Sequence, residues 1–355
     1  MGGVRSVVRT AWSLPINNLK ILLPLNLLKM NNQLDISVLT LVQDRRDHLA
    51  NLVAGVLKSN VWPKELIVVH MGEPAWDVAS AAYSQVGVVG VDYQKPARPD
   101  TVGRGSNAQS AGGKFVKGPM TLSLRQVELP GNKGHLPLAK ARNRAATLAK
   151  GKQMIFLDVD CIIHPDYLEE MSAAISKTDG LVMSDVHYLA SGINDSGWTF
   201  EKFEASAIPH PRRPYLELGD LNRSDKYYLF WSLSFGCTKK VFARIGGFDA
   251  RFTGFGGEDT DFALSARQAG VPFYLCGAIA YHQYHATISP PLNHLENIIE
   301  NANIYKQKWG KWPMENWLRA FQKGGFVDWN DRRLKLRRLP TNNELKSYKS
   351  EKLFA

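Results

Sequence analysis

The sequence predicts an α/β protein with a mostly parallel central sheet flanked by helices. From residue 36, short runs rich in Val, Ile and Leu alternate with segments whose apolar residues recur at helical spacing. Strand and helix alternating at short intervals are typical of a parallel sheet with crossover helices. With 355 residues and 44% hydrophobic content, the chain is long enough to bury one sizeable core.

The expected elements are taken in chain order. Residues 36–42 and 65–70 read as buried strands, and the helix between them has its leucines and valines on one face. A third strand is expected at 86–93, followed by a long loop at 94–134 with a hairpin at 120–129. A helix at 136–150 is closed by Gly151, and a fourth strand follows at 153–157. A helix after Pro165, at 166–175, leads into a fifth strand at 180–186.

Three segments are predicted from composition. Residues 1–34 form a basic, leucine-bearing amino-terminal segment, 35–290 the α/β domain, and 291–355 a helical and basic extension. The longest apolar run near the amino terminus is far shorter than the ~20 residues of a spanning helix. Within 187–235, six aromatic and His side chains are expected to line a binding surface, with an ordinary core role as the alternative: His187, Tyr188, Trp198, Tyr227, Tyr228 and Trp231.

The net charge of +11 is concentrated at the two ends of the chain. Residues 1–30 hold four basic residues and no acid, and residues 323–352 hold nine basic residues and four acids. Nucleic-acid binding would need a basic stripe on the folded body, so it is not expected. Basic ends suggest peripheral contact with an anionic membrane or a partner. The alternative is that the two ends are solvated and flexible. Three widely spaced cysteines indicate neither a disulfide framework nor a zinc site, which favours a cytoplasmic setting, with peripheral membrane association left open.

Two carboxylates follow the strand at 153–157. Asp158 and Asp160 stand at its carboxyl end, where ligands bind in open α/β sheets. Residues two apart on an extended backbone point the same way, so both side chains can converge on one cation. Oxygen ligands suit Mg²⁺ or Mn²⁺. The alternative is a pair of ordinary turn-forming or helix-capping aspartates.

A second acidic cluster follows a glycine-rich turn. Glu258, Asp259 and Asp261 occupy the expected first turn of an amphipathic helix, after the glycines of "FTGFGG". Glycines let the backbone approach a ligand closely. The alternative is a purely structural role, in which these acidic residues interact with the helix dipole and cap the helix.

Taken together, "FLDVD" and "GGFDARFTGFGGEDTDFALSARQAG" resemble the inverting GT-A glycosyltransferases of family 2, of the bacterial chondroitin polymerase type. They also resemble the carboxy-terminal motif of β-1,4-galactosyltransferases. The resemblance covers roughly 35–70 and 136–290. It implies a GT-A, Rossmann-like nucleotide-sugar-binding fold. It further implies an enzyme that moves a sugar from a nucleoside-diphosphate sugar, expected to be UDP-linked, to a glycan or other hydroxyl acceptor in polysaccharide or glycoconjugate synthesis.

The resemblance also implies roles for individual residues. Asp158 and Asp160 match the DxD motif, which holds Mn²⁺ or Mg²⁺ against the donor diphosphate. Asp259 matches the general base, with Glu258 beside it. The remaining matched positions are donor contacts: Thr40, Val42, Arg45, Lys140, Arg142 and Asn143.

A third metal ligand is expected from "YHQYH" at 281–285, where related enzymes use a histidine after the last strand. His282 is the first choice and His285 the alternative; a histidine with no ligand role also remains open. Two competing functions are a sugar-phosphate nucleotidyltransferase and a non-catalytic basic scaffold. A nucleotidyltransferase would need a glycine-rich basic signature near the amino terminus, whereas strand 36–42 leads into "QDRRDHL". A basic scaffold would carry its charge on the folded body, whereas the charge of this chain lies at its ends.

Overall fold

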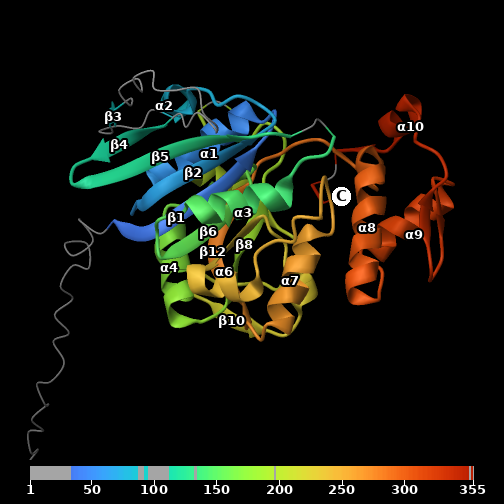
Figure 1. Cartoon of the computed structure of the whole chain (residues 1–355). Helices are drawn as coiled ribbons and strands as arrows, with labels where there is room; N and C mark the ends of the chain where they lie inside the picture. Colours follow the sequence, from blue (N-terminus) through green and yellow to red (C-terminus); the bar gives the residue numbers. More distant parts are fainter. Residues whose placement is uncertain are drawn as a thin grey trace, which may run out of the picture. The chain divides into compact units, whose positions relative to one another are not determined.

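A computed structural model gives the fold of the chain (Figure 1). It describes residues 33–86, 92–94, 112–131, 134–195, 197–351 and 353–354. The amino-terminal segment predicted at 1–34 therefore lies almost entirely outside the described residues. The same is true of all but the last three residues of 100–114, which the sequence suggested as a loop closing over a donor.

One large sheet forms the centre of the described structure. Its main strands are β1 Leu34–Val42, β2 Pro63–Met71, β3 Asp92–Gln94, β4 Gly112–Lys117, β5 Met120–Leu129, β6 Gln153–Leu157, β8 Leu181–Tyr188, β10 Leu221–Ser224, β11 Ser234–Thr238 and β12 Phe273–His282. Their order across the sheet is β10-β12-β8-β11-β6-β1-β2-β5-β4-β3. Two short strands join its side, with β7 Cys161–Ile163 on β12 and β9 Ile208–Pro209 on β8.

The inner strands of this sheet are mostly parallel. β6, β1, β2 and β5 run parallel to one another, as do β8 and β12. β11 is antiparallel to both of its neighbours, and the edge strands β10, β4 and β3 also pair antiparallel. The predicted α/β class with a mostly parallel core is therefore confirmed.

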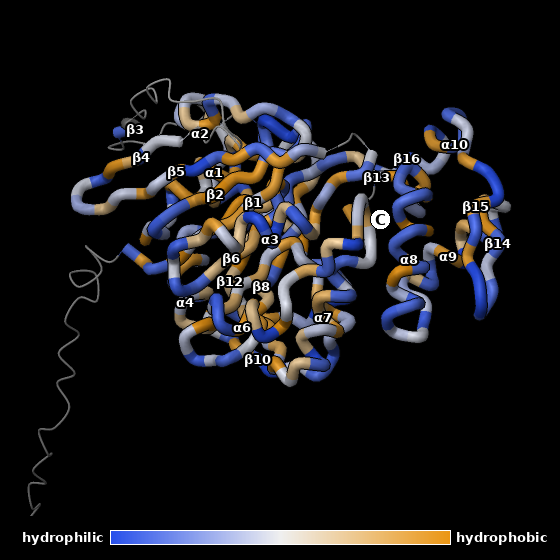
Figure 2. Tube along the Cα trace, viewed as in Figure 1, coloured by the Kyte–Doolittle hydropathy of each residue, from blue (hydrophilic) through white to orange (hydrophobic). Residues whose placement is uncertain are grey.

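Helices cover both faces of the sheet (Figures 1 and 2). On one face lie α1 Arg46–Lys58, α2 Val78–Val86, α4 Tyr167–Lys177 and α5 Phe200–Ser206, and on the other α3 Leu138–Leu148, α6 Lys239–Ile245 and α7 Glu258–Gln268. Alternate residues of β1 enter the two cores: Val38 and Val42 the first, Leu39 and Leu41 the second. A strand buried on both faces is apolar throughout, which explains the continuous hydrophobic runs in the sequence.

Three predicted elements differ from the structure. The strand expected at 86–93 is wrong at Val86, which ends α2, and confirmed at Asp92 and Tyr93, which lie in β3; residues 87–91 lie outside the described residues. Residues 120–129 are one strand, β5, which pairs with β4 and β2 rather than folding on itself as a hairpin. α3 closes at Ala149, whose N–H donates to the Ala145 carbonyl. Gly151 instead packs so tightly against β1 that a Cβ would lie 2.5 Å from the Ser37 nitrogen.

The extension after residue 290 has a core of its own. Its elements are α8 Leu295–Trp309, α9 Glu315–Lys323, the hairpin of β14 Val327–Trp329 and β15 Leu334–Leu336, and α10 Asn342–Ser347. Ile298, Leu318, Phe321 and Phe326 are buried between them. The chain then returns toward the α/β domain, where β16 Lys349–Ser350 pairs with β13 Thr287–Ile288. Among the described residues no helix is both long and apolar enough to cross a membrane.

Candidate active site

The site begins where β6 ends. Asp158 follows Leu157 directly, and its backbone N–H donates to the Leu233 carbonyl at 2.8 Å. The chain then turns, with the Cys161 N–H donating to the Asp158 carbonyl at 2.9 Å, and enters β7. Because β7 pairs with the end of β12, Cys161 lies opposite His282. This pairing brings the turn that carries Asp160 beside the histidines that follow β12.

Asp160 and two histidines form a cluster able to hold a metal ion. The ligand atoms of Asp160, His282 and His285 lie within 4.8 Å of one another. His285 Nε2 is 3.5 Å from Asp160 Oδ2, and His48 Nδ1 is 2.5 Å from Asp160 Oδ1. Burial opposes ionisation of Asp160, but the hydrogen bond with His48 and the charge of Arg45 outweigh it and lower the pKa of that carboxyl. Burial lowers the pKa of His282 to about 4, which leaves its imidazole neutral at pH 7.

A buried polar network holds the Asp160 turn in place. The Gln283 backbone N–H donates to the Asp160 carbonyl at 2.7 Å, and Gln283 Nε2 donates to the His48 carbonyl at 3.0 Å. Gln283 Oε1 accepts from Asn51 Nδ2 at 2.8 Å, and Asn51 Oδ1 accepts from the Trp198 indole at 2.9 Å. A fully satisfied network of this kind fixes the positions of the groups attached to it.

Sequence reasoning missed His48, Asn51 and Gln283. The only local signal was a polar residue between the two histidines of "YHQYH". His48 lies 112 residues before its partner Asp160, and Asn51 lies 232 residues before Gln283, so neither contact leaves a motif in the sequence.

Arg142 links the two acidic clusters. Its guanidinium is 3.3 Å from Asp158 Oδ1 and 3.2 Å from Glu258 Oε1, and it lies over the Phe248 ring at 5.1 Å. Burial alone would lower the pKa of Arg142, but the two carboxylates raise it above the usual value. Burial raises the pKa of Asp158 to about 6 despite the nearby guanidinium. Asp158 therefore pairs with Arg142 and stands outside the cluster of Asp160 and the histidines.

Glu258 and Asp259 occupy the first turn of α7, as the sequence predicted. Gly257 caps the helix with φ of +90°, a conformation that side chains disfavour. Burial, and after it the neighbouring charge of Glu258, raise the pKa of Asp259 to about 7. Glu258 Oε2 is buried and has no hydrogen-bond partner among the described residues. A buried oxygen without a donor is costly, so this atom is available to a hydroxyl of a bound ligand.

The glycine-rich loop before α7 is held by α8. Asn301 Nδ2 donates to the carbonyls of Thr253 at 2.9 Å and Gly256 at 2.8 Å. Gly254 has φ of +69°, and a Cβ there would lie 2.2 to 2.6 Å from the Asn297 amide group. The carboxy-terminal extension therefore fixes the loop that presents Asp259.

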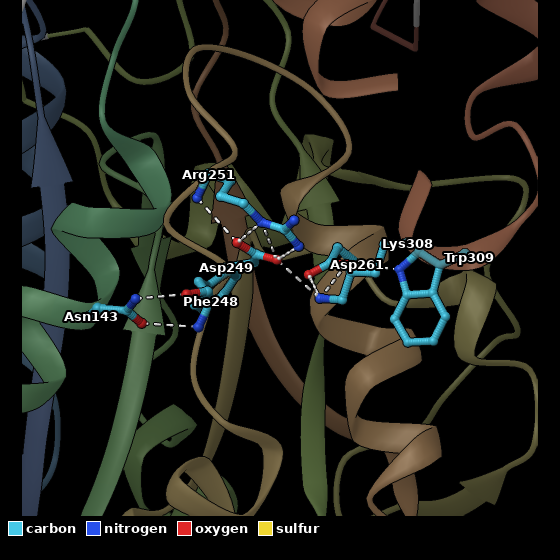
Figure 3. Close-up of polar contacts among 7 residues, drawn as sticks. All are labelled: Asn143, Phe248, Asp249, Arg251, Asp261, Lys308 and Trp309. Atoms are coloured by element: carbon cyan, nitrogen blue, oxygen red, sulfur yellow. Dashed lines mark hydrogen bonds and ion pairs between the residues drawn. The ribbon is translucent and has the colours of Figure 1, made fainter. Parts of the chain in front are cut away.

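Figure 3 shows two contacts that brace this region. Asp261 is 1% exposed and binds Lys308 Nζ at 2.8 Å and the Trp309 indole N–H at 2.8 Å, which ties α7 to α8. Asn143 bonds both backbone groups of Phe248, with its Nδ2 2.7 Å from the carbonyl oxygen and its Oδ1 2.9 Å from the nitrogen. These contacts give Asp261 and Asn143 structural positions, and the donor contact expected of Asn143 is not where its side chain points.

One cavity of about 950 Å³ joins these groups, within the size range of ligand sites. Its lining includes four acids and two histidines of the site: Asp158, Asp160, Glu258, Asp259, His282 and His285. Arg45, Tyr188, Tyr228, Trp231 and Phe255 also line it. Phe255 stacks on His294 at 4.6 Å and on Trp317 at 5.9 Å, so aromatic rings of the extension form one wall.

Several predicted positions lie elsewhere. Thr40 and Val42 are buried on the opposite side of β1, and Leu41 and Gln43 line the cavity in their place. Lys140 is exposed on α3 outside the lining, so Arg142 is the residue of its helix that reaches the site. Trp198 is a core residue, Tyr227 donates to the Val271 carbonyl, and His187 pairs with Asp185.

Comparison with known proteins gives this arrangement a family context. Residues 125–290 match the model of "Glycosyltransferase like family 2". This stretch is therefore similar to the glycosyltransferase domains of that family. It includes Arg142, both acidic clusters and the two histidines.

Individual proteins are more distantly similar. Two curated proteins called validoxylamine A glucosyltransferase, from Streptomyces hygroscopicus subsp. jinggangensis (strain 5008) and subsp. limoneus, are 25% identical over 158 residues. The match covers 38% of this chain and 36% and 34% of theirs, so the chain matches about a third of their length. Among solved structures, S. aureus TarS 1-349 has a TM-score of 0.44 at 16% identity, covering 76% of this chain and 64% of that one. GalNAc-T7 with UDP, GalNAc and Mn²⁺ has a TM-score of 0.44 at 13% identity, covering 70% and 43%.

Proposed function

We propose that the protein is a metal-dependent inverting glycosyltransferase that moves a sugar from a nucleoside-diphosphate sugar to a hydroxyl group of a glycan or similar acceptor. UDP is the proposed nucleotide. One observation carries the proposal: the cluster of Asp160, His282 and His285 and the high-pKa carboxyl of Asp259 open onto the same cavity. Transfer needs a group to stabilise the leaving diphosphate and a base for the acceptor hydroxyl, in one site.

The residues present fit a divalent cation. One carboxylate and two neutral imidazoles form a mixed oxygen and nitrogen donor set, which suits Mn²⁺ better than Mg²⁺, since Mg²⁺ prefers oxygen ligands. When bound, such an ion would supply positive charge against the leaving diphosphate. Arg45, 3.9 Å from Asp160 and about a third exposed, adds a cation on the same side.

Asp259 is the proposed general base. A carboxyl with a pKa near 7 accepts a proton more readily than an ordinary aspartate, because its conjugate acid is weaker. Glu258 is proposed to accept a hydrogen bond from a sugar hydroxyl through its unpaired Oε2. Arg142 pairs with Glu258 and orients its carboxylate, and the aromatic wall of Phe255 and Trp317 offers stacking surface to the acceptor.

The test is release of nucleoside diphosphate from a panel of nucleotide sugars with Mn²⁺ and a mixture of hydroxyl acceptors. Wild type should turn over at least one donor, Asp160→Ala should lose metal-dependent turnover, and Asp259→Asn should lose transfer by about 10²–10⁴-fold while still binding Mn²⁺. Asp328→Asn, an exposed aspartate in the β14–β15 hairpin, is the matched control. No turnover of any donor by wild type would contradict the function. Full transfer by Asp259→Asn would contradict the base assignment alone.

Peripheral membrane contact on the cytoplasmic side is a further part of the proposal. The β14–β15 hairpin exposes Arg333, Lys335 and Arg337 beside the exposed Leu336 and Leu339. Basic side chains next to exposed leucines suit an anionic lipid surface, at about 1 kcal/mol per cation.

Membrane contact predicts sedimentation with phosphatidylglycerol vesicles that weakens in salt and in Lys335→Glu/Arg337→Glu. Lys150→Glu/Lys152→Glu, a charge reversal of two exposed lysines in the α/β domain, is the matched control and should bind as wild type. Equal binding to phosphatidylcholine vesicles would contradict an electrostatic contact.

A further inference from the structure

The end of the described chain returns to the active site. We define the carboxy-terminal strap as residues 349–351, 353 and 354. It is attached through β16, which pairs with Thr287 and Ile288, only two residues beyond His285. The backbone N–H of Ser289 donates to the Tyr348 carbonyl at 3.0 Å, which continues the attachment on the other side of the pair. Leu353 and Phe354 then line the same cavity as the acidic clusters.

Phe354 reaches a metal-site histidine through one intervening ring. Its ring contacts Tyr188 edge-on at 5.2 Å, and Tyr188 stacks on His282 at 4.8 Å. Phe354 also contacts His210 at 4.8 Å, and His210 meets Trp231 at 4.7 Å. Edge-to-face pairs at these distances are attractive beyond the area they bury. Tyr188 is therefore held between Phe354 and His282, and its orientation depends on both.

The backbone pairing of the strap with the domain is short. Its strand pairs only two residues with β13, and Lys349 and Glu351 are exposed. Short segments with little buried surface open more readily than the domain that carries them. The strap can therefore leave the cavity without unfolding the sheet or the core of the extension.

We propose that the strap is a removable wall of the active site and that Phe354 is a positioning residue, acting through Tyr188 on His282. This rests on the proposed function. In transfer, the acceptor oxygen bonds to the anomeric carbon, the bond from that carbon to the diphosphate oxygen breaks, and the acceptor proton passes to the base. In hydrolysis, water takes the place of the acceptor. A closed strap excludes water, so its loss shifts the enzyme from transfer toward hydrolysis.

The experiment compares Phe354→Ala, Phe354→Tyr and Ser350→Pro with wild type. Mn²⁺ affinity is measured by calorimetry, and the ratio of donor hydrolysed to donor transferred is measured with Mn²⁺ present. Phe354→Ala should bind Mn²⁺ about tenfold more weakly, as expected when the support of a ligand is removed, and should raise the hydrolysis ratio several-fold. Phe354→Tyr, which keeps the ring, should restore both values to within twofold. Leu218→Ala, an exposed leucine of the α/β domain, is the matched control and should change neither.

Ser350→Pro tests the strap without touching the cavity. It removes the N–H of a β16 residue, so it should release the strap and reproduce both effects of Phe354→Ala. The Glu-specific endoproteinase Glu-C should then cut faster after the exposed Glu351, as followed by mass spectrometry, while the unfolding temperature stays close to that of wild type.

Two outcomes would overturn the inference. One is a folded Phe354→Ala protein whose Mn²⁺ affinity and hydrolysis ratio both stay within twofold of wild type. The other is a Phe354→Tyr protein as defective as Phe354→Ala, since the ring contact would then have no role. If wild type consumed no nucleotide sugar, the proposed function would fail instead, and the Mn²⁺ affinities would still decide whether Phe354 supports the metal-site histidine.

Discussion

The two residues of the ion pair Asp261–Lys308 should be energetically coupled, because the pair joins α7 to α8 through an almost fully buried carboxylate. Asp261 is 1% exposed, and Lys308 Nζ lies 2.8 Å from its Oδ1, which also accepts from Trp309 (Figure 3). The perturbation is a double-mutant cycle of Asp261→Ala and Lys308→Ala, which isolates the pairwise term.

The magnitudes follow from what each substitution leaves behind. Asp261→Ala removes a charge-assisted hydrogen bond, about 1.5–3 kcal/mol, and leaves the partly buried Trp309 N–H without its acceptor, about 1–3 kcal/mol. A loss of about 4 kcal/mol in the free energy of unfolding is expected. Lys308 is about a quarter exposed and also reaches Asp249 at 3.2 Å, so Lys308→Ala should cost about 2 kcal/mol. A coupling of about 1–2 kcal/mol means that the double variant loses less than the sum.

Urea denaturation at pH 7 measures all four proteins of the cycle. The exposed pair of Arg319 and Glu315 on α9, 3.8 Å apart, is the matched control, and its coupling should stay below about 0.5 kcal/mol. If the losses from Asp261→Ala and Lys308→Ala simply add within about 0.3 kcal/mol, the contact does not join the two helices energetically and the reasoning is refuted.

Three other outcomes are expected. Transfer should rise with pH through about 7, because the base form of Asp259 is the deprotonated one and its pKa is raised to about 7; a flat pH–rate profile between pH 6 and 8 would contradict its role as base. Gly254→Ala should lower transfer and stability together, by about 2 kcal/mol in unfolding free energy, since its Cβ meets Asn297, whereas Gly118→Ala, with open space around it, should avoid that clash. Arg142→Met should lower the free energy of unfolding, measured by urea denaturation, by about 3–5 kcal/mol, because it leaves two carboxylates unpaired. Arg144→Met, at an exposed position of the same helix, should change that free energy by under 0.5 kcal/mol.

The sheet and the acidic ends of two elements were predictable from local pattern. β1 and β2 begin within two residues of the predicted 36–42 and 65–70 and end within one, because strands buried on both faces leave long apolar runs. Asp158 and Asp160 follow such a run, and Glu258 and Asp259 follow glycines, so both acidic clusters could be placed at element ends. These positions need only nearest neighbours along the chain.

Thr40, Val42 and Asn143 were predicted to contact the donor, and each prediction depended on which face of an element meets the cavity. Thr40 and Val42 have the same parity along β1, and the strand is apolar on both sides, so the sequence carries no alternation to say which side faces the site. Asn143 stands next to Arg142 on α3, and only the packing of the Phe248 backbone against that helix separates a donor contact from a brace. Contacts made across more than a hundred residues, such as His48 with Asp160, leave no local pattern at all.

The extension after residue 290 helps to form the candidate active site, although the matched family segment ends there. Asn301 holds the carbonyls of the glycine-rich loop, and Asn297 fills the space beside Gly254, so the loop conformation that presents Asp259 depends on α8. Without α8 those carbonyls lose their Asn301 donor, and three glycines, which can adopt many backbone conformations, are held less firmly in the one that presents Asp259. The proposed base and its loop therefore belong to the matched segment, while contacts from the extension hold that loop in place.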